Sequence, residues 1–239
     1  MSLEGKVVLV TGGARRIGRS IALALAGEGA RVAIHYGESR EEAEATAKEC
    51  GGAPVFQAEL TDVQDLRAMF GRVAEHFGAF DGLVNNAARF TKFDPLTIEE
   101  ADWDYIHDIN LKATFFAAQA AARIMLKSGR GGHIVNISSL GGLRPWSDHA
   151  HYCASKAGVI MLTRALAKAW APDIAVNSVA PGVIPFGKTD ERIERLIAMT
   201  PAQRAGTGAE IAEAVLFFLK ASRFTTGQVV AVDGGLSQK

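Results

Sequence analysis

The sequence predicts an α/β fold in which one doubly wound parallel sheet of about seven strands carries helices on both faces. Short β-branched runs alternate with longer stretches of helical period, which is the pattern of a parallel sheet covered on both sides. The first run leads directly into a glycine-rich turn, and no repeat, low-complexity segment or Pro/Gly-rich linker divides the chain. Residues 1–239 are therefore expected to form one domain.

The predicted elements follow in chain order. Strands are expected at 6–11, 31–36, 54–58, 82–85, 133–137, 174–179 and 228–232. Helix starts are expected where a Ser or Thr stands three residues before a Glu or Gln, because such a capping box satisfies two backbone amides. The pairs are Ser39 with Glu42, Thr61 with Gln64, Thr97 with Glu100, and Thr207 with Glu210. Long connections at 86–98, 138–150 and 181–190 follow strand ends, where an open parallel sheet binds its ligand.

The composition excludes several classes of protein. The chain is 48% hydrophobic and 22% charged, and 26 basic residues balance 26 acidic residues. Balanced charge without a long basic run argues against nucleic-acid binding. No apolar segment is long enough to span a membrane, and the start, MSLEGK, is too short and polar for a signal peptide. Two cysteines without metal or disulfide spacing predict a cytoplasmic location, and no metal site is expected.

The segment TGGARRIGRSIA, at 11–22, is the first functional element. A strand, a glycine turn and a run of small residues place a helix amino terminus where its free N–H groups and dipole attract a diphosphate. Gly12 belongs to the turn, and Gly18 lets the helix approach the first strand closely. Arg16 stands where a bare backbone usually contacts the pyrophosphate, so we expect its guanidinium to bind the phosphate oxygens. An ordinary strand-to-helix turn is the alternative interpretation.

A second group of polar residues follows the predicted fourth and fifth strands. Ser139 stands at a strand end, and Tyr152 and Lys156 lie one helical turn apart, so the phenol and the ammonium project from the same helix face. The Tyr-x-x-x-Lys pair alone is a weak signal, since a half-buried Tyr beside a solvated Lys has the same spacing. Here it follows the glycine turn, an NNAA segment and Asn110 within a long apolar helix.

In this order and spacing the chain resembles the short-chain dehydrogenase/reductase family, from Lys6 to the terminal VVAVDGG. The resemblance implies a Rossmann-type fold and hydride transfer between a nicotinamide cofactor and a small-molecule substrate. It implies that Tyr152 is the general acid and that Ser139 holds the same substrate oxygen. Lys156 is implied to bind the nicotinamide ribose and to ease ionisation of the phenol. Asn110 is implied to hold a water that links Lys156 to solvent.

The resemblance also implies a set of cofactor-binding residues. They are Gly12, Arg15, Arg16, Ile17, Gly18, Tyr36, Ser39, Arg40, Glu59, Leu60, Asn86, Ala87, Lys156, Pro181, Gly182 and Val183. Relatives that prefer NADH carry a carboxylate at the end of the second strand, where this chain has Tyr36. The missing negative charge, with Arg15 and Arg40 nearby, predicts NADPH as the cofactor. Glu38 is a nearby charge that argues for NADH, and Glu59 replaces the Asp that usually contacts adenine.

The sequence leaves two classes of substrate open. The segments TGGARRIG, HYGES and NNAARF resemble the pteridine reductases, in which arginine replaces the middle glycine and an aromatic residue stacks on the substrate ring. That aromatic is Phe90, and Trp146 and Phe186 are expected to add walls to the pocket. Parasite pteridine reductases carry Asp where this chain keeps Ser139, which is the residue of an ordinary carbonyl reductase. Reduction of a carbonyl and of a pterin-like C=N bond therefore both stay open.

Other classes of protein fit the pattern less completely. A 3-oxoacyl carrier-protein reductase is expected to show a basic patch for its acidic carrier, for which Arg89, Lys92, Arg123 and Lys127 are candidates. Epimerases and dehydratases of the family usually have longer chains. A non-enzymatic NADP-sensing regulator would have no reason to retain the serine, tyrosine and lysine together.

The resemblance further implies a homotetramer or homodimer. The expected interfaces are the helices near 99–127 and 152–170 and the seventh strand. The segment ATFFAAQAAARIML is apolar nearly all the way round, so it needs cover on more than one side.

Overall fold

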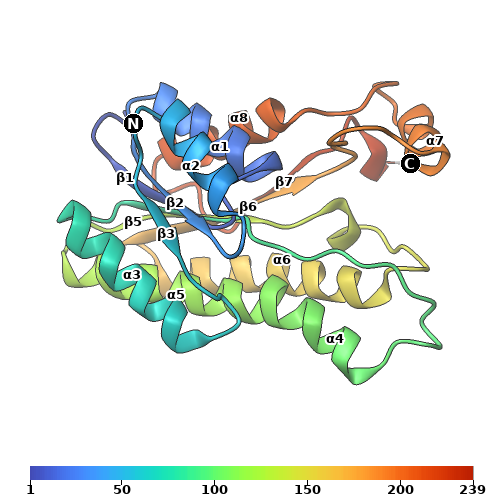
Figure 1. Ribbon diagram of the computed structural model, residues 1–239, viewed down its shortest axis with the longest axis horizontal. Helices are drawn as coiled ribbons and strands as arrows, with labels where there is room; N and C mark the ends of the chain where they lie inside the picture. The colour runs from blue at the N-terminus through green and yellow to red at the C-terminus, as the bar shows by residue number, and fades with distance from the viewer. Residues whose placement is uncertain (239) are drawn as a thin grey trace.

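Seven strands form one parallel sheet in the order β3-β2-β1-β4-β5-β6-β7. Figure 1 shows this sheet between helices in the computed structural model, which describes residues 1–238. The strands are β1 (Val7–Val10), β2 (Arg31–Tyr36), β3 (Val55–Gln57), β4 (Gly82–Asn85), β5 (Gly132–Ile137), β6 (Ile174–Pro181) and β7 (Val229–Val232). The predicted fold class is confirmed, and a strand lies at each of the seven predicted positions.

Helices cover both faces of this sheet. They are α1 (Arg16–Gly27), α2 (Arg40–Glu49), α3 (Val63–Phe77), α4 (Glu100–His107), α5 (Ala113–Lys127), α6 (Ala150–Trp170), α7 (Glu191–Met199) and α8 (Gly208–Lys220). In Figure 1, α1, α2 and α8 lie on one face, and α3, α5 and α6 lie on the other. Side chains alternate between the two cores: Val8 packs with α1 and α8, whereas Leu9 packs with α3 and α5. Because both faces are buried, the strands are apolar without a break.

The four predicted capping boxes have different outcomes. Thr207 and Glu210 form the expected box at the start of α8, with Thr207 N–H donating to Glu210 Oε2 at 2.8 Å. Ser39 does precede α2, but its side chain makes no capping hydrogen bond. The prediction of a capping box at Ser39 was therefore wrong, and its hydroxyl is left for another partner.

The other two predicted boxes, at Thr61 and Thr97, were wrong. Asp62 caps α3 by accepting hydrogen bonds from two backbone amides. Glu99 caps α4 in a box with Asp102. In both cases a carboxylate lies one or two residues further on, and an ionised acceptor binds backbone N–H groups more strongly than a hydroxyl does.

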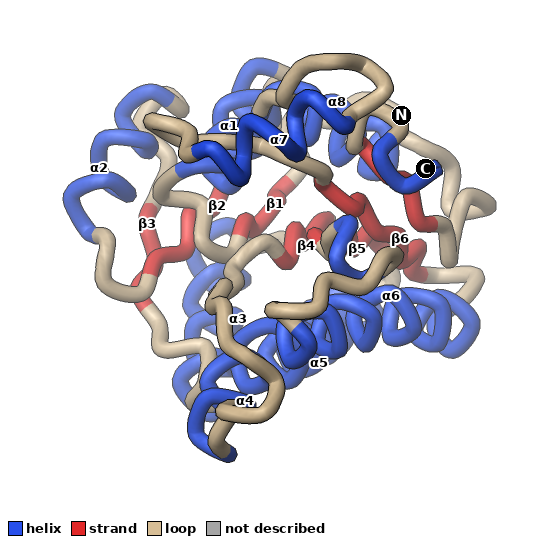
Figure 2. Tube along the Cα trace, turned by 90° about the vertical axis from the view of Figure 1, so that its right-hand side faces the viewer, coloured by secondary structure: helices blue, strands red, loops and turns tan. Residues whose placement is uncertain are grey.

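The sheet order reverses between β1 and β4, and the loops after these strands are joined. Asn86, after β4, donates its backbone N–H to Thr11 Oγ1 at 2.9 Å and its side-chain amide to Gly12 O at 3.0 Å. Figure 2 looks along the strands onto the side of the sheet where their carboxyl ends lie, called here the candidate-site edge. In an open parallel sheet, a ligand binds outside the strand ends at such a reversal.

Two further features bear on the site at this edge. The predicted long helix near 99–127 is divided, because Asp108–Lys112 forms a π-helical turn between α4 and α5. Helix α7 follows β6 and buries none of its residues. Within residues 1–238, no helix combines the length and apolar character needed to cross a membrane.

Candidate active site

The glycine turn (residues 11–18) has an unusual backbone. Gly12 has φ of +60°, and Arg16 has φ of +52°, which is the left-handed region that favours glycine. A residue with a Cβ pays about 1–2 kcal/mol there. Glycine is therefore the low-energy residue at position 16, and Arg16 is retained at a conformational cost.

The polar groups of this turn are open to a ligand. Within the described residues, the exposed guanidinium groups of Arg15 and Arg16 have no hydrogen-bond or ion-pair partner. The amides of Arg16, Ile17 and Gly18 are the first of α1 and have no preceding helical carbonyl to bond. A Cβ on Gly18 would lie 2.1 Å from Gly12 O, so only glycine allows α1 to start this close to β1. The turn therefore presents amides and cations together.

A buried polar group lies after β5. Tyr152 is 9% exposed, and burial raises the pKa of its phenol to about 12, against a hydrogen bond with Ser139 that lowers it. Lys156 is 3% exposed, and burial lowers the pKa of its ammonium to about 8. Its Nζ donates to Ile137 O at 2.9 Å and lies 6.0 Å from the centre of the Tyr152 ring. The structure brings the three residues together, Tyr152 and Lys156 as their helical spacing predicted and Ser139 as the resemblance implied.

Ser138, beside Ser139, has different partners. Its Oγ donates to Val179 O at 3.1 Å and accepts from Ser178 Oγ at 2.8 Å, so it joins β5 to β6. Ser139 Oγ instead accepts from Gly141 N–H at 3.0 Å, at the start of a 3₁₀ turn. The two neighbouring hydroxyls thus face different surroundings, and Ser139 is the one beside Tyr152.

Asn110 lies on the π-helical turn, and its side chain fastens the loop after β4. Its Oδ1 accepts from Arg89 N–H at 2.8 Å, and its Nδ2 donates to Arg89 O at 3.0 Å and to Ser155 Oγ at 3.1 Å. Such turns are frequent at functional sites. The amide therefore ties this loop to the helix that carries Lys156, and the water-holding role of Asn110 stays a prediction.

Two of the three predicted substrate aromatics gather over Tyr152. Phe90 lies edge-on to the Tyr152 ring at 4.8 Å between ring centres and stacks on His149 at 4.7 Å. Trp146 is parallel to Tyr152 at 6.1 Å. Phe90 remains 57% exposed, so part of its ring faces solvent above the phenol. Phe186 lies elsewhere, beside the start of α8 at Gly208.

One carboxylate that the sequence reasoning missed joins the loops around this aromatic group. Asp148 binds Lys92 at 3.1 Å, His149 at 2.6 Å and Arg192 of α7 at 3.4 Å. Burial alone would raise the pKa of Asp148, but the hydrogen bonds from Lys92 and His149 hold it at about 2. The acidic residue precedes Tyr152 by four positions, but nothing in its sequence context marks partners on other loops.

The residues predicted for the adenosine half lie after β2 and β3. Tyr36 is buried at the end of β2, and Arg40 is exposed and donates to Glu44 at 2.8 Å. The carboxylate of Glu59 accepts from the N–H and the hydroxyl of Thr61, which lowers its pKa. Leu60 is buried in the core, so only its backbone can meet a ligand.

The residues predicted for the nicotinamide half lie after β6 and β4. Pro181 ends β6, and Gly182 N–H donates to Val232 O at 3.0 Å. A Cβ on Gly182 would come within 2.6 Å of Asp233 Cα, so the segment is closely packed. Val183 O accepts from Gly206 N–H, and Ala87 N–H donates to Thr11 Oγ1 at 3.2 Å. The predicted residues thus line both sides of the reversal between β1 and β4.

Comparison with known proteins gives consistent results. Residues 12–237 match the protein family described as enoyl-(acyl carrier protein) reductase. A 3-oxoacyl-[acyl-carrier-protein] reductase FabG of Staphylococcus aureus is 40% identical over 241 residues, covering 97% of this chain and 98% of the relative. A 2-dehydro-3-deoxy-D-gluconate 5-dehydrogenase of Escherichia coli is 36% identical, covering 98% and 96%.

Solved structures also resemble this chain over nearly its whole length. A mutant of a Serratia marcescens short-chain dehydrogenase/reductase superimposes with a TM-score of 0.92 at 34% identity, covering 99% of this chain and all of that one. A putative short-chain alcohol dehydrogenase of Sinorhizobium meliloti superimposes with a TM-score of 0.93 at 36% identity, covering 100% and 98%. Similarity of this extent covers the sheet, the glycine turn and the group around Tyr152 alike.

Proposed function

Because the chain belongs to the short-chain dehydrogenase/reductase family and is an oxidoreductase of that family, we propose that it reduces a carbonyl substrate with NADPH. The observation that carries the proposal is the buried group of Ser139, Tyr152 and Lys156, which lies after β5 at the same end of the parallel strands as the glycine turn after β1. The bound cofactor would supply the hydride. The test is NADPH oxidation measured against a panel of ketones, 3-oxoesters and dihydropteridines.

The residues at the candidate-site edge fit a dinucleotide. The diphosphate would meet the free amides at the start of α1 and the unpaired guanidinium of Arg16. The adenosine half would lie beside Tyr36 and Arg15. The hydroxyl of Ser39, which makes no capping hydrogen bond to α2, would bind a phosphate. The nicotinamide ribose would receive hydrogen bonds from the ammonium of Lys156. The site thus offers amides and arginine side chains where the negatively charged phosphates of NADPH would lie, and the buried ammonium of Lys156 where the nicotinamide ribose would lie.

The chain's own groups then account for the proton. A phenol with a pKa of about 12 is protonated throughout the neutral range, so Tyr152 is ready to donate a proton to the substrate oxygen. Ser139 would bind the same oxygen and hold it against the phenol. Lys156 would stabilise the phenolate left after transfer, since a nearby cation lowers a phenol pKa. Asn110 would complete the path by which the proton is replaced.

Arg15→Ala is expected to weaken NADPH about tenfold or more and to change NADH little, because only NADPH carries the additional phosphate. A charge-assisted contact of this kind contributes about 1.5–3 kcal/mol. Arg40→Ala is expected to have the same sign and a smaller size, because Glu44 already binds that guanidinium. Dissociation constants for both cofactors give the measurement, and Arg164→Ala on α6 is the control. Equal losses for NADPH and NADH would assign Arg15 to the diphosphate instead.

Arg16→Gly is expected to weaken NADPH and NADH together, by about tenfold, because both carry the diphosphate. The substitution also removes left-handed strain of about 1–2 kcal/mol, against about 0.5–1 kcal/mol of added chain entropy in the unfolded state. Thermal unfolding should therefore show an unchanged or slightly raised stability. Loss of affinity without loss of stability separates a binding role from a structural one, and a gain in affinity would show that the arginine serves no ligand.

The relatives' names favour a 3-oxoacyl thioester as the substrate. The predicted basic patch supports this less well, because the structure does not bring its four residues together. Arg89 lies over the Tyr105 ring at 4.1 Å, and Lys92 is bound to Asp148. Arg123 and Lys127 lie near the end of α5, and Lys127 is five residues before the start of β5. They are therefore at the end of the sheet where the strands begin, opposite the candidate site. A carrier would therefore meet Arg89 and Lys92 first.

A pterin-like bicycle is the second candidate, favoured by the exposed face of Phe90 above the phenol. Two variants separate the classes when assayed on one dihydropteridine and one 3-oxoester. For a carbonyl reductase, Ser139→Ala is expected to lower turnover severely on the 3-oxoester, by about 10²-fold, because the substrate oxygen loses its partner. For a pterin reductase, Phe90→Ala is expected to raise the Michaelis constant for the dihydropteridine selectively, while Ser139→Ala is mild. A severe Ser139 effect with an indifferent Phe90 effect would exclude the pterin.

We also propose a homotetramer or homodimer. Within residues 1–238, the edge strand β7 has no further strand beside it in the sheet, and Val230 within it is 39% exposed. Met161 on α6 is 61% exposed. Pairing of β7 and of α6 with a second copy would cover these apolar side chains.

A further inference from the structure

His35 on β2 joins two loops of the candidate site through its imidazole. The ring is 3% exposed. Its Nδ1 accepts a hydrogen bond from Gly12 N–H at 3.0 Å, and its Nε2 lies 3.1 Å from Ala58 O. A backbone N–H can only donate and a carbonyl can only accept, so Nδ1 carries the lone pair and Nε2 carries the proton. The two contacts therefore require one neutral tautomer.

The two anchored residues belong to different ends of the dinucleotide site. Gly12 begins the glycine turn that would bind the diphosphate. Ala58 directly precedes Glu59, which stands where relatives contact adenine, and Leu60, which is also predicted to bind the cofactor. Backbone hydrogen bonds run alongside, from Gly13 N–H to His35 O at 3.0 Å and from Ala58 N–H to Tyr36 O at 3.3 Å. The imidazole is thus the side-chain link between the two loops.

We propose that His35 is a positioning residue for the cofactor, which sets the separation between the glycine turn and the loop at 58–60. This inference rests on the proposed function, because it takes the ligand to be a nicotinamide dinucleotide. Gly12 N–H is held by His35 and is not available to the phosphates. The diphosphate then depends on the amides of α1 and on Arg16, whose place is set by the turn that His35 holds.

The charges around the ring agree with a neutral imidazole. Burial lowers the pKa of His35 to about 4, against the hydrogen bond to Ala58 O and the carboxylates of Glu59 and Asp65, which raise it. The pKa in the folded state lies below the ordinary value of 6.5, so the imidazole is neutral at neutral pH and keeps both hydrogen bonds. Protonation would remove the lone pair that accepts from Gly12, so the stabilisation that the neutral ring gives the fold is present above about pH 6.5 and is lost as the pH falls toward 4.

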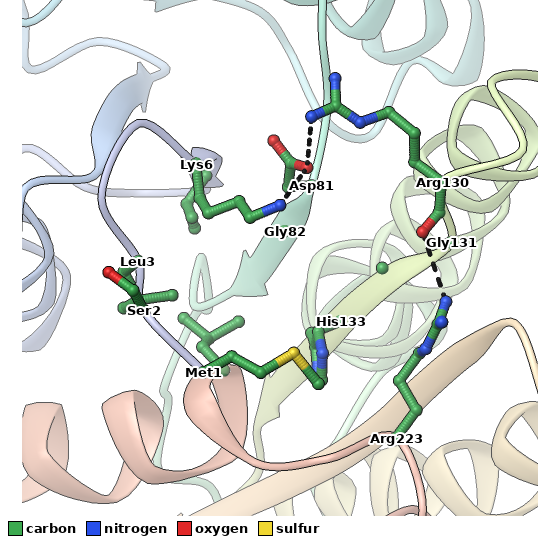
Figure 3. A pocket seen from close by; sticks show the side chains of 13 residues that line it. Met1, Ser2, Leu3, Lys6, Asp81, Gly82, Arg130, Gly131, His133 and Arg223 are labelled. Carbon is green, nitrogen blue, oxygen red and sulfur yellow. Dashed lines mark hydrogen bonds and ion pairs between the residues drawn. The ribbon is translucent and has the colours of Figure 1, made fainter.

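His133 on β5 provides a matched control. Figure 3 shows it beside Met1 in a cavity at the opposite edge of the sheet, where Lys6, Asp81 and Arg130 also lie. Its pKa is also lowered to about 4, chiefly by burial, and its Nδ1 has no partner in the described chain. His133 is therefore a strand histidine with a similar pKa shift that lies away from the glycine turn and from the loop at 58–60.

Two substitutions separate the hydrogen bond to Gly12 from the hydrogen bond to Ala58. Asn places an amide oxygen near the position of Nδ1, so His35→Asn keeps an acceptor for Gly12 and loses the bond to Ala58. Gln places an amide nitrogen near the position of Nε2, so His35→Gln keeps a donor for Ala58 and loses the bond to Gly12. Each variant removes one of the two side-chain hydrogen bonds, while the neighbouring backbone hydrogen bonds remain and a polar group still fills the site.

The experiment measures dissociation constants for NADPH and for 2′,5′-ADP by titration calorimetry. Both His35 variants are expected to weaken both ligands about tenfold, with kcat at saturating NADPH within about twofold of the wild type. Hydrogen exchange at the Gly12 amide should accelerate in His35→Gln and stay slow in His35→Asn. His133→Asn should leave both affinities unchanged.

Wild-type affinity in both folded His35 variants would overturn the inference. If neither variant folds, the imidazole ¹⁵N shifts of the wild-type protein decide, and a tautomer protonated at Nδ1 would overturn it equally. Failure of the wild-type protein itself to bind NADPH would instead overturn the proposed function, so the two failures are distinguishable.

Discussion

Tyr152→Phe is expected to lower turnover by about 10²–10⁴-fold and to leave NADPH affinity within about twofold. The substitution removes the hydroxyl that would protonate the substrate oxygen. It keeps the ring that packs against Phe90 and Trp146, so the pocket should retain its shape. Steady-state rates and dissociation constants for NADPH give the measurement. Tyr105→Phe, on the exposed face of α4, is the control and should change neither.

The pH dependence of the wild type tests the same assignment. With a phenol pKa of about 12 in the free enzyme, the reduction rate should not fall through loss of the Tyr152 proton between about pH 6 and 8. The reverse oxidation needs the phenolate, so its rate should rise with pH. Near-wild-type turnover in Tyr152→Phe would remove this residue from the chemistry.

Lys156→Met is expected to lower turnover at least about 10²-fold, to weaken NADPH, and yet to stabilise the fold. Burial lowers the pKa of Lys156 from 10.5 to about 8, so below pH 8 the folded protein carries the full cost of a buried cation. Since a pKa difference of one corresponds to about 1.36 kcal/mol, the free energy of unfolding at neutral pH should rise by about 1–3 kcal/mol. The gain should shrink as the pH rises from about 8 to 10.5.

Denaturant unfolding at about pH 7 and about pH 10 measures this gain. Lys48→Met, at an exposed position in the last turn of α2, is the control and should alter neither stability nor turnover. A Lys156→Met variant that is less stable at both pH values would show that the hydrogen bond to Ile137 O outweighs the burial of the charge.

The fold was predictable because burial on both faces leaves a direct mark on the sequence. Each strand is a short apolar run, and the turn after β1 contains glycines that close packing requires. The meeting of Tyr152 and Lys156 was predictable for a similar reason, since four residues on a helix return to the same face. Ser139 stands at a strand end, and its place beside Tyr152 was expected from the family resemblance.

The remaining features depend on contacts between distant segments, which local patterns do not record. The left-handed backbone of Arg16 contradicts what its residue type favours. The capping boxes predicted at Thr61 and Thr97 do not form, because nearby carboxylates bind the first amides of these helices instead. Asp148 and His35 carry no motif, and each acquires its partners only when loops after different strands meet. His35 is one of six histidines, and its neighbours in the sequence do not distinguish it from the others.

Helix α7 is expected to make the candidate site sensitive to salt. It buries no residue, and the ion pair that joins it to the loop before α6, between Arg192 and Asp148, is 45% and 32% exposed on its two sides. An exposed pair of this kind contributes about 0–1 kcal/mol and is screened by dissolved ions. Elements held so weakly open on the microsecond-to-millisecond scale without unfolding the sheet. The rate at which product leaves should therefore rise with ionic strength, whereas the chemical step in the buried interior should not.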